Sequence, residues 1–315
     1  MNNYAKVFRN KIILVTGGTG SIGSEVVRQL LKYHPKKIRI YSRDETAQFY
    51  LQNELEINAR NKETLRFLIG DVRDKERLMR AMEDVDIVFH TAALKHVPYC
   101  ERNPFEAVKT NVLGAQNIID CALARGVKKV VAISSDKAVY PNTLMGVTKL
   151  LMERMVTSVW NYSGMAKTQF SAVRFGNVLE SRGSVIPLWR KQIEAGGPVT
   201  VTDKNMKRFF MSIPDAVNLV FCAASLMKGG ETFILKMEEK SIYELAQETI
   251  VKYGNGKKVA IKLTGARERE KLEEKLFTDE EKESLIDRGP FYILLPDHEN
   301  FKTRKRLYNT RSKVR

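Results

Sequence analysis

The segment Ser134-Ser135-Asp136-Lys137 places a carboxylate beside an amine, directly after the apolar run VKKVVAI. Such a pair can move protons, because a carboxylic acid donates a proton and a neutral amine accepts one. A lysine is neutral at ordinary pH only when it is buried or lies near another cation, such as Lys149. An ordinary exposed ion pair is the alternative. The sequence therefore offers Asp136 and Lys137 as an acid/base pair, with the division of roles between them open.

A second motif suits phosphate binding. The run TGGTGSIG ends the apolar stretch KIILV and leads into a helical pattern. Glycines let the backbone approach a pyrophosphate closely, and the N-terminus of the next helix offers free N–H groups. A plain tight turn is the alternative, but the strand–turn–helix context favours a dinucleotide site. The cofactor contacts predicted here are Thr16, Gly17, Thr19, Gly20, Ser21, Ile22 and Gly23.

The end of the second apolar run separates the two nicotinamide cofactors. About twenty residues after the last glycine, an NAD-binding protein usually places an acid on the ribose hydroxyl. Here Ser42-Arg43 stands at that place, and a guanidinium suits the 2′-phosphate of NADP. Asp44 follows and could serve the hydroxyl instead, so we expect NADP and keep NAD as the alternative. Asp71 is placed either to accept from the adenine amine or to cap the next helix.

These residues need a sheet to position them, and the chain predicts one. Strands are expected at KIILVTG, KIRIYS, LRFLIGD, DIVFHTA, VKKVVAISS and TQFSAVRFGNV. Helices are expected at 24–33, 44–60, 74–83, 106–125 and 143–163. Strands separated by helices imply right-handed crossovers, so the expected fold is α/β, a Rossmann-type doubly wound parallel sheet.

The pattern loosens beyond about residue 178, where glycines and prolines become frequent. We expect residues 1–178 to form an NADP-binding domain, with 209–240 returning to it. Residues 179–315 are expected to form mainly a smaller substrate-binding lobe and a basic tail, and this part of the chain predicts one more strand at ETFILKM and a helix at SIYELAQETIVKYG. The ligand cleft of such a fold lies at the carboxyl ends of the strands.

Composition narrows the class of protein. The net charge is +16, and seven of the last fourteen residues are basic. A nucleic-acid contact is one interpretation of this tail, but a solvated terminus is the one we expect. The three cysteines and four histidines have no disulfide or metal-site spacing, so no metal is expected. Without a signal-peptide pattern or a run of about eighteen apolar residues, we expect a cytoplasmic protein with no membrane span.

Five motifs resemble the extended short-chain dehydrogenase/reductase superfamily: TGGTGSIG, GDV at 70–72, TAALKHV at 91–97, NVLG at 111–114 and VRFGNV at 173–178. The segments AALKHVPYCERNP, SSDKAVYPNTLMGVTK and MKRFFM are similar to the bacterial UDP-N-acetylglucosamine 4,6-dehydratases of polysaccharide and flagellin-sugar biosynthesis. The resemblance implies NADP as cofactor, UDP-N-acetylglucosamine as substrate and a homo-oligomer. In that reaction the cofactor takes hydride from sugar C4, water is lost across C5 and C6, and hydride returns to C6.

The resemblance also assigns catalytic roles. It implies that Asp136 and Lys137 act at C6 and C5, and that Lys149 holds the nicotinamide ribose. Ser135 and Met145 complete the implied catalytic group. Met145 stands where the superfamily has a tyrosine, and a thioether cannot move the C4 hydroxyl proton. This methionine marks either a subfamily or a catalytically inactive relative.

The remaining site residues are also implied by the resemblance. The further cofactor contacts are Ser42, Arg43, Asp71, Val72, Ala92, Ala93, Lys95 and Lys149. The substrate contacts are Lys95, His96, Asn177, Val185, Arg208, Arg267 and Glu270. The two arginines could clamp a diphosphate, although the family's proline and glycine are missing from the segment 267–271. A UDP-sugar 4-epimerase and a non-catalytic NADP-binding regulator stay as alternative functions.

Overall fold

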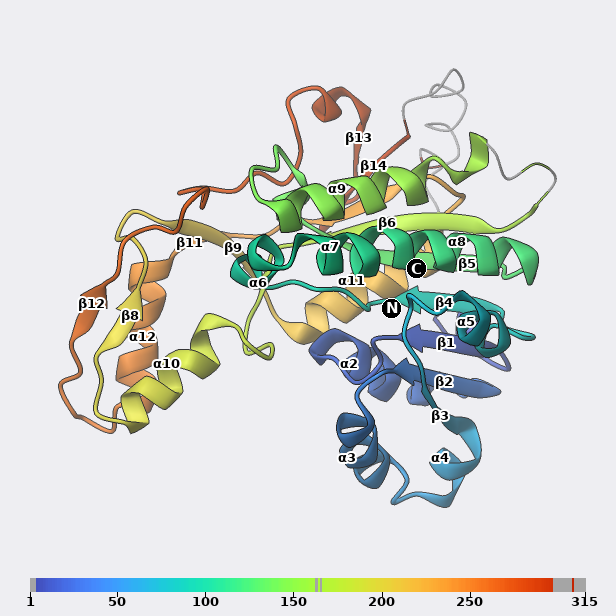
Figure 1. Cartoon of the computed structure of the whole chain (residues 1–315), viewed down its shortest axis with the longest axis horizontal. Helices are drawn as coiled ribbons and strands as arrows, with labels where there is room; N and C mark the ends of the chain where they lie inside the picture. The colour runs from blue at the N-terminus through green and yellow to red at the C-terminus, as the bar shows by residue number, and fades with distance from the viewer. Residues whose placement is uncertain (1–3, 162–163, 165, 297–307, 309–315) are drawn as a thin grey trace.

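The computed structural model describes residues 4–161, 164, 166–296 and 308 (Figure 1). Its largest element is a nine-stranded sheet, counted over these residues, in the order β13-β14-β10-β6-β5-β4-β1-β2-β3. The strands are β1 (Ile12–Thr16), β2 (Lys37–Ser42), β3 (Leu65–Ile69), β4 (Ile87–His90), β5 (Lys129–Ser135), β6 (Gln169–Phe175), β10 (Thr232–Leu235), β13 (Leu285–Asp287) and β14 (Phe291–Leu294). The strands from β10 to β3 are parallel, and β14 and β13 extend the sheet in antiparallel fashion.

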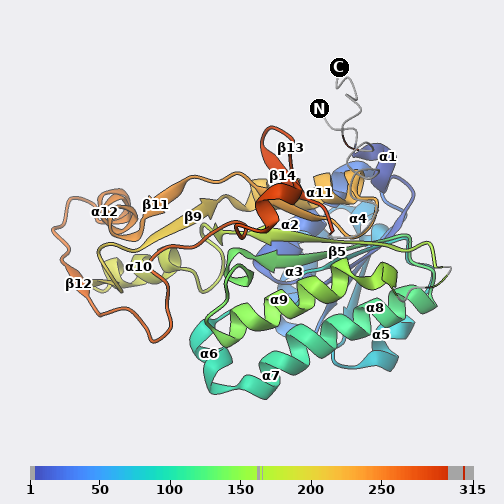
Figure 2. The ribbon, with the colours of Figure 1, turned by 90° about the horizontal axis from the view of Figure 1, so that it is seen from above.

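Helices cover both faces of this sheet, which Figure 2 shows from above. One face carries α1 (Ala5–Phe8), α2 (Ser21–Leu30), α3 (Glu45–Leu55) and α11 (Ile213–Leu226), and the other carries α5 (Lys75–Ala81), α8 (Gly114–Ala124) and α9 (Leu144–Thr157). Alternate residues of β1 serve the two layers, because Ile13 and Val15 join the first core and Leu14 the second. The predicted doubly wound α/β fold is therefore confirmed.

Two predicted helices are interrupted in the structure. The helix expected over 44–60 ends at Leu55, and α4 (Ala59–Thr64) begins after Asn58, whose side chain accepts from the backbone N–H of Arg60 at 2.9 Å. Asparagine is a favoured N-cap residue, because its side-chain oxygen accepts from the free N–H groups at the start of a helix. Asn58 therefore marks the break between the two helices. The second is the helix expected over 106–125, which consists of α7 (Pro104–Val108), a π-helical turn (Lys109–Leu113) and α8.

A smaller lobe lies beside the main sheet, at the left of Figure 1. It contains α10 (Val185–Glu194) and α12 (Ile242–Tyr253), with the strands β7 (Asn177–Val178), β8 (Val199–Val201), β9 (Lys207–Met211), β11 (Glu239–Ser241) and β12 (Ile261–Leu263). A core around the buried Trp189 holds α10 and α12 together. The strands β10, β13 and β14 follow β7 in the chain but belong to the main sheet, and helix α11 packs against that sheet. The domain division at residue 178 stays a prediction.

No described helix has both the length and the apolar character needed to cross a bilayer. Within the part of the chain that the structure describes, no three His, Cys, Asp or Glu side chains gather as metal ligands. The basic residues predicted to form a solvated tail, 302, 304–306, 311, 313 and 315, lie outside the described residues.

Candidate active site

The glycine-rich turn after β1 has a shape that only glycine allows. Gly17 has a φ of +65°, and a Cβ there would lie 2.7 Å from the backbone nitrogen of Ala92. A Cβ on Gly23 would lie 2.3 Å from the carbonyl oxygen of Gly17. Helix α2 starts at Ser21 with no side-chain cap, so no capping side chain accepts from its first N–H groups. This open cradle, predicted from the sequence, fits the pyrophosphate of a dinucleotide.

The end of β2 presents an exposed guanidinium. Arg43 has 58% of its side chain exposed and lies 3.6 Å from Asp71, measured from Nη1 to Oδ2. Asp44, the rival ligand for a ribose hydroxyl, caps α3 by accepting from the N–H of Ala47 at 2.9 Å. The hydroxyl of Ser42 is buried against that of Thr19, 2.8 Å away. The guanidinium of Arg43 is therefore exposed, whereas the carboxylate of Asp44 is engaged in capping α3.

Asp71 is held by arginine and caps no helix. The cap of α5 is Asp74, which accepts from the N–H of Arg77 at 2.9 Å, so the capping alternative for Asp71 was wrong. Asp71 instead accepts from the backbone N–H and the guanidinium of Arg73 at 3.0 and 2.7 Å. Burial opposes ionisation, but the hydrogen bonds from Arg73 hold the pKa of Asp71 below its ordinary value.

Hydrogen bonds from Asn111 fix the loop after β4. This asparagine lies in the π-helical turn and pairs with both the N–H and the carbonyl of Leu94, at 2.8 and 2.9 Å. It also donates to the hydroxyl of Thr148, next to Lys149 on α9. The segment containing Ala92, Ala93 and Lys95 is thus held against the same helix as Lys149. Val72 packs nearby, where a Cβ on Gly114 would meet it at 2.8 Å.

The Asp136–Lys137 pair is not an ordinary surface ion pair, because Asp136 has no exposed area. Its Oδ1 accepts from Ser135 Oγ at 2.9 Å and from Lys137 Nζ at 3.0 Å. Lys137 Nζ also lies 3.4 Å from Asn177 Oδ1 and 3.8 Å from Glu274 Oε1. The carboxyl end of β5 and the start of β7 thus bring an acid, an amine and an amide together.

Several buried polar atoms have no hydrogen-bond partner in the described structure. They are Thr110 Oγ1, Ser134 Oγ, Asp136 Oδ2, Asn177 Nδ2 and Ser184 Oγ. Ser134 and Asp136 lie at the carboxyl end of β5, and Asn177 is the first residue of β7, one residue after β6 ends. Buried polar groups are normally paired, so this cluster indicates the place of a polar ligand.

Lys149 and Met145 lie on the same helix with different surroundings. Lys149 Nζ donates to the carbonyl of Ile133 at 2.8 Å, and burial lowers its pKa to about 8. Met145 is 3% exposed and packs with Cys100 and Ala107 in an apolar cluster. Tyr140 does not substitute for the missing tyrosine, because its hydroxyl donates to Asp279 Oδ2 at 3.1 Å. No tyrosine among these residues takes the place that the superfamily reserves for one.

The predicted substrate contacts in the lobe differ in their burial and in their hydrogen bonds. Arg208 is buried, and its guanidinium donates to the carbonyls of Lys271 and Leu272 at 2.8 and 2.9 Å. These donors hold the segment 271–272 in place, and the diphosphate contact of Arg208 stays a prediction. Arg267 is exposed, and its backbone N–H donates to Glu270 Oε2 at 3.1 Å. Val185 is the first residue of α10.

Two residues near the site carry no signal in the sequence. Glu274 is buried beside Lys137 and also lies 3.5 Å from Lys271 Nζ. Arg182 lies over the glycine-rich turn, where its backbone N–H donates to Ser21 Oγ at 2.9 Å. Each stands in a stretch of alternating charges or small polar residues, which is typical of a solvated surface. Only the folded chain identifies them.

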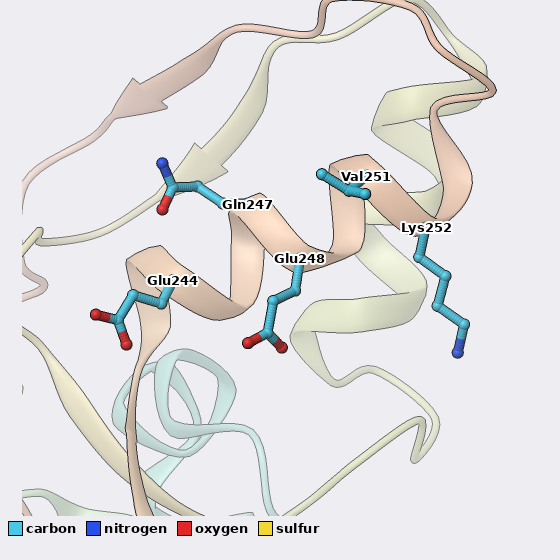
Figure 3. A pocket seen from close by; sticks show the side chains of 5 residues that line it. All are labelled: Glu244, Gln247, Glu248, Val251 and Lys252. Atoms are coloured by element: carbon cyan, nitrogen blue, oxygen red, sulfur yellow. The ribbon is translucent and has the colours of Figure 1, made fainter.

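Hollows in the lobe are separate from these residues. Figure 3 shows one along α12, whose side chains fan out from a single helix and do not converge. It is lined by Glu244, Gln247, Glu248, Val251 and Lys252. A second, of about 420 Å³, lies between α10, α12 and the start of α11. Neither contains a residue of the glycine-rich turn or of the Asp136–Lys137 pair.

Comparison with known proteins gives one family. Residues 13–296 match the family described as polysaccharide biosynthesis protein. An uncharacterized membrane protein of Methanocaldococcus jannaschii is 52% identical over 310 residues, covering 96% of this chain and 92% of that protein. The inverting UDP-N-acetylglucosamine 4,6-dehydratase of Campylobacter jejuni is 42% identical over 292 residues, covering 92% and 84%.

Solved structures and other relatives add the fold and a second activity. The X-ray structure of Pen from Bacillus thuringiensis superposes with a TM-score of 0.89 at 43% identity, covering 92% of this chain and 90% of that one. Rickettsia proteins at 40–41% identity carry the name UDP-glucose 4-epimerase. The relatives thus include both kinds of nucleotide-sugar enzyme that the site chemistry has to distinguish.

Proposed function

The chain belongs to the polysaccharide biosynthesis protein family, and from this premise we propose that it is an NADP-dependent UDP-N-acetylglucosamine 4,6-dehydratase. The proposal is carried by one observation, the fully buried Asp136 whose Oδ2 has no partner and whose Oδ1 accepts from Lys137. Removing water from a sugar requires an acid at the departing oxygen and a base at the neighbouring carbon. This pair supplies both groups at one end of one strand.

The chain's own residues divide the remaining work. A nicotinamide dinucleotide, when bound in the glycine-rich cradle, supplies hydride chemistry to the reaction. Lys149 holds the nicotinamide end, since it is anchored to β5 through the carbonyl of Ile133. Asp136 and Lys137 exchange protons with C6 oxygen and C5, and Asn177 orients the sugar beside them. Burial of Asp136 keeps water away from these transfers.

The epimerase alternative is supported by the names of the Rickettsia relatives. Both reactions begin with loss of the C4 hydroxyl proton, which the superfamily's tyrosine accepts, and Met145 stands at that place in an apolar cluster, so another group must accept this proton in either case. An epimerase, however, needs no acid at the C6 oxygen and no base at C5. A buried acid/base pair would then have no task, so the dehydratase accounts for more of the site. A non-catalytic regulator would leave the same pair without a purpose.

A mass assay tests this function. The purified protein is incubated with UDP-N-acetylglucosamine and no added cofactor, and the product mass is recorded. Loss of one water is the expected result. An isomer of unchanged mass would identify an epimerase, and no turnover by protein that holds a dinucleotide would favour the regulator. The dinucleotide released by denaturing the same sample is expected to be NADP, because Arg43 is open and Asp44 caps a helix; NAD alone would contradict that choice.

We also propose that the chain pairs with a second copy through α7 and α9. Large apolar side chains are exposed on these helices and the π-helical turn between α7 and α8, namely Phe105, Val108, Leu113, Val147 and Leu151. Large exposed apolar side chains on neighbouring elements are typical of a protein interface. Sedimentation equilibrium of Leu151→Lys is expected to give a smaller species than wild type. A wild-type protein that sediments as a monomer would contradict the pairing.

A further inference from the structure

Glu274 belongs to a row of four alternating charges that begins at Asp136. Oδ1 of Asp136 accepts from Lys137 Nζ at 3.0 Å, and the same amine lies 3.8 Å from Glu274 Oε1. Oε2 of Glu274 in turn lies 3.5 Å from Lys271 Nζ. Glu274 is buried, and a buried carboxylate is stable only when cations or hydrogen-bond donors compensate it. The two amines supply that compensation, and one of them is the proposed base of the reaction.

The segment that carries Glu274 is fixed to the loop that carries Lys137. Lys271 Nζ donates to the carbonyl of Val139 at 2.7 Å, two residues after Lys137. The guanidinium of Arg208 donates to the carbonyl of Lys271 at 2.8 Å. Both hydrogen bonds hold the backbone just before Glu274, so its carboxylate has a defined place beside the amine although the two residues are far apart in the chain.

The amine of Lys137 needs an acceptor whose charge does not change during the reaction. A lysine side chain is long and flexible, so other groups have to determine where its amine lies. Asp136 is the nearest such group, but it exchanges protons with the substrate and with Lys137. Passing one proton from Lys137 to Asp136 makes both neutral and weakens their attraction at the moment when the amine has to accept the C5 proton. The second carboxylate in the row is free of this conflict.

We propose that Glu274 is a positioning residue that holds the amine of Lys137 at the sugar while protons move between Lys137, Asp136 and the substrate. The inference rests on the proposed function, which gives the pair its task. In the elimination, Lys137 takes the C5 proton, the electrons of that bond form the C5–C6 double bond, and the C6 oxygen leaves as water with the proton of Asp136. Glu274 and Lys271 stay an ion pair throughout, so Glu274 acts only through Lys137.

Steady-state kinetics of Glu274→Gln tests the inference. This variant keeps the volume of the side chain and removes its charge, so kcat for dehydration of UDP-N-acetylglucosamine is expected to fall about tenfold, since a small misplacement of a reacting group is costly. KM is expected to stay within about twofold, because the sugar contacts remain. Glu273→Gln is the matched control and is expected to keep the wild-type kcat. Glu273 is the adjacent residue, but its side chain is exposed and pairs with Lys207 at 3.1 Å.

A conservative variant covers the case in which Glu274→Gln does not fold, which circular dichroism detects. Glu274→Asp keeps the charge but shortens the reach to Lys137. Its kcat is expected to lie between those of wild type and Glu274→Gln, about threefold below wild type, with KM again unchanged. A wild-type kcat in both Glu274 variants overturns the inference, because the amine would then be held without this carboxylate.

A double variant separates positioning from a general structural role. When Glu274 acts through Lys137, adding Glu274→Gln to Lys137→Ala lowers the residual kcat no further. A structural role would lower kcat by the same factor in both backgrounds, and that result overturns the inference. A wild-type protein that forms no dehydrated sugar would instead overturn the proposed function, so the two failures are distinguishable.

Discussion

Lys137→Ala is expected to lower kcat for dehydration of UDP-N-acetylglucosamine by about 10³-fold while leaving the dinucleotide bound. The amine of Lys137 contacts Asp136, Asn177 and Glu274, so its removal takes away the centre of the proton-transferring group. General acid–base groups contribute about 10²- to 10⁴-fold. The glycine-rich turn and Lys149 are untouched, because they lie on other elements. Product formation by mass and bound dinucleotide by absorbance are the two measurements.

The matched control for this variant is Lys275→Ala. Lys275 lies on the same segment as Glu274 but is exposed, and its amine is 3.6 Å from Asp279. It is expected to keep the wild-type rate. Asp136→Asn separates shape from charge, since it preserves the side-chain volume and removes the ionisable group. Near-normal turnover in Lys137→Ala would remove the proposed mechanism.

The second large effect is on stability. Arg174→Met is expected to lower the free energy of unfolding by about 3–5 kcal/mol, because it leaves two buried carboxylates without their cation. Arg174 is 1% exposed, and its guanidinium donates to Glu153 at 2.6 Å and to Glu281 at 2.7 Å. It also donates to the carbonyl of Leu276 at 3.1 Å. Urea unfolding at neutral pH measures the change.

Arg154→Met is the control, because Arg154 lies 3.9 Å from the same Glu281 but is largely exposed. An exposed pair contributes at most about 1 kcal/mol, so little change is expected. Adding Glu153→Gln and Glu281→Gln to Arg174→Met is expected to restore part of the stability, since no buried charge is then left. A loss below 1 kcal/mol in Arg174→Met alone would show that the two carboxylates find other partners.

The sequence predicts the main sheet because local signals coincide there. The strands from β1 to β6 are short apolar runs bounded by glycine or polar residues, and the turn after β1 needs glycine for its geometry. Helix α10 escaped prediction because Pro187 and the glycines around it are typical of a loop, and β14 escaped because a short apolar run does not show which strand it pairs with. Their place is decided by the surfaces against which they pack, which the local pattern does not contain.

The candidate site, like the fold, was predictable where it depends on residues that are adjacent in the chain. Asp136 and Lys137 are adjacent in the chain and follow a strand, so their meeting was a local matter. Glu274 reaches Lys137 across more than a hundred residues, and in a chain with 37 acidic residues its type distinguishes nothing. Arg208 was predicted only as a diphosphate contact, and the sequence did not show that its guanidinium is buried against backbone carbonyls. Burial of a charged side chain depends on long-range packing, which spacing does not reveal.

The junction at Gly176 has a consequence for how such an enzyme can change. One residue separates β6 of the main sheet from β7 of the lobe, and a Cβ there would lie 2.8 Å from the carbonyl oxygen of Phe209. Asn177 follows immediately and reaches Lys137. A tilt of the lobe therefore moves Asn177 relative to an amine that is fixed to the sheet. Substitutions far out in the lobe that accommodate a different sugar must preserve this angle, which limits how freely substrate preference can diverge.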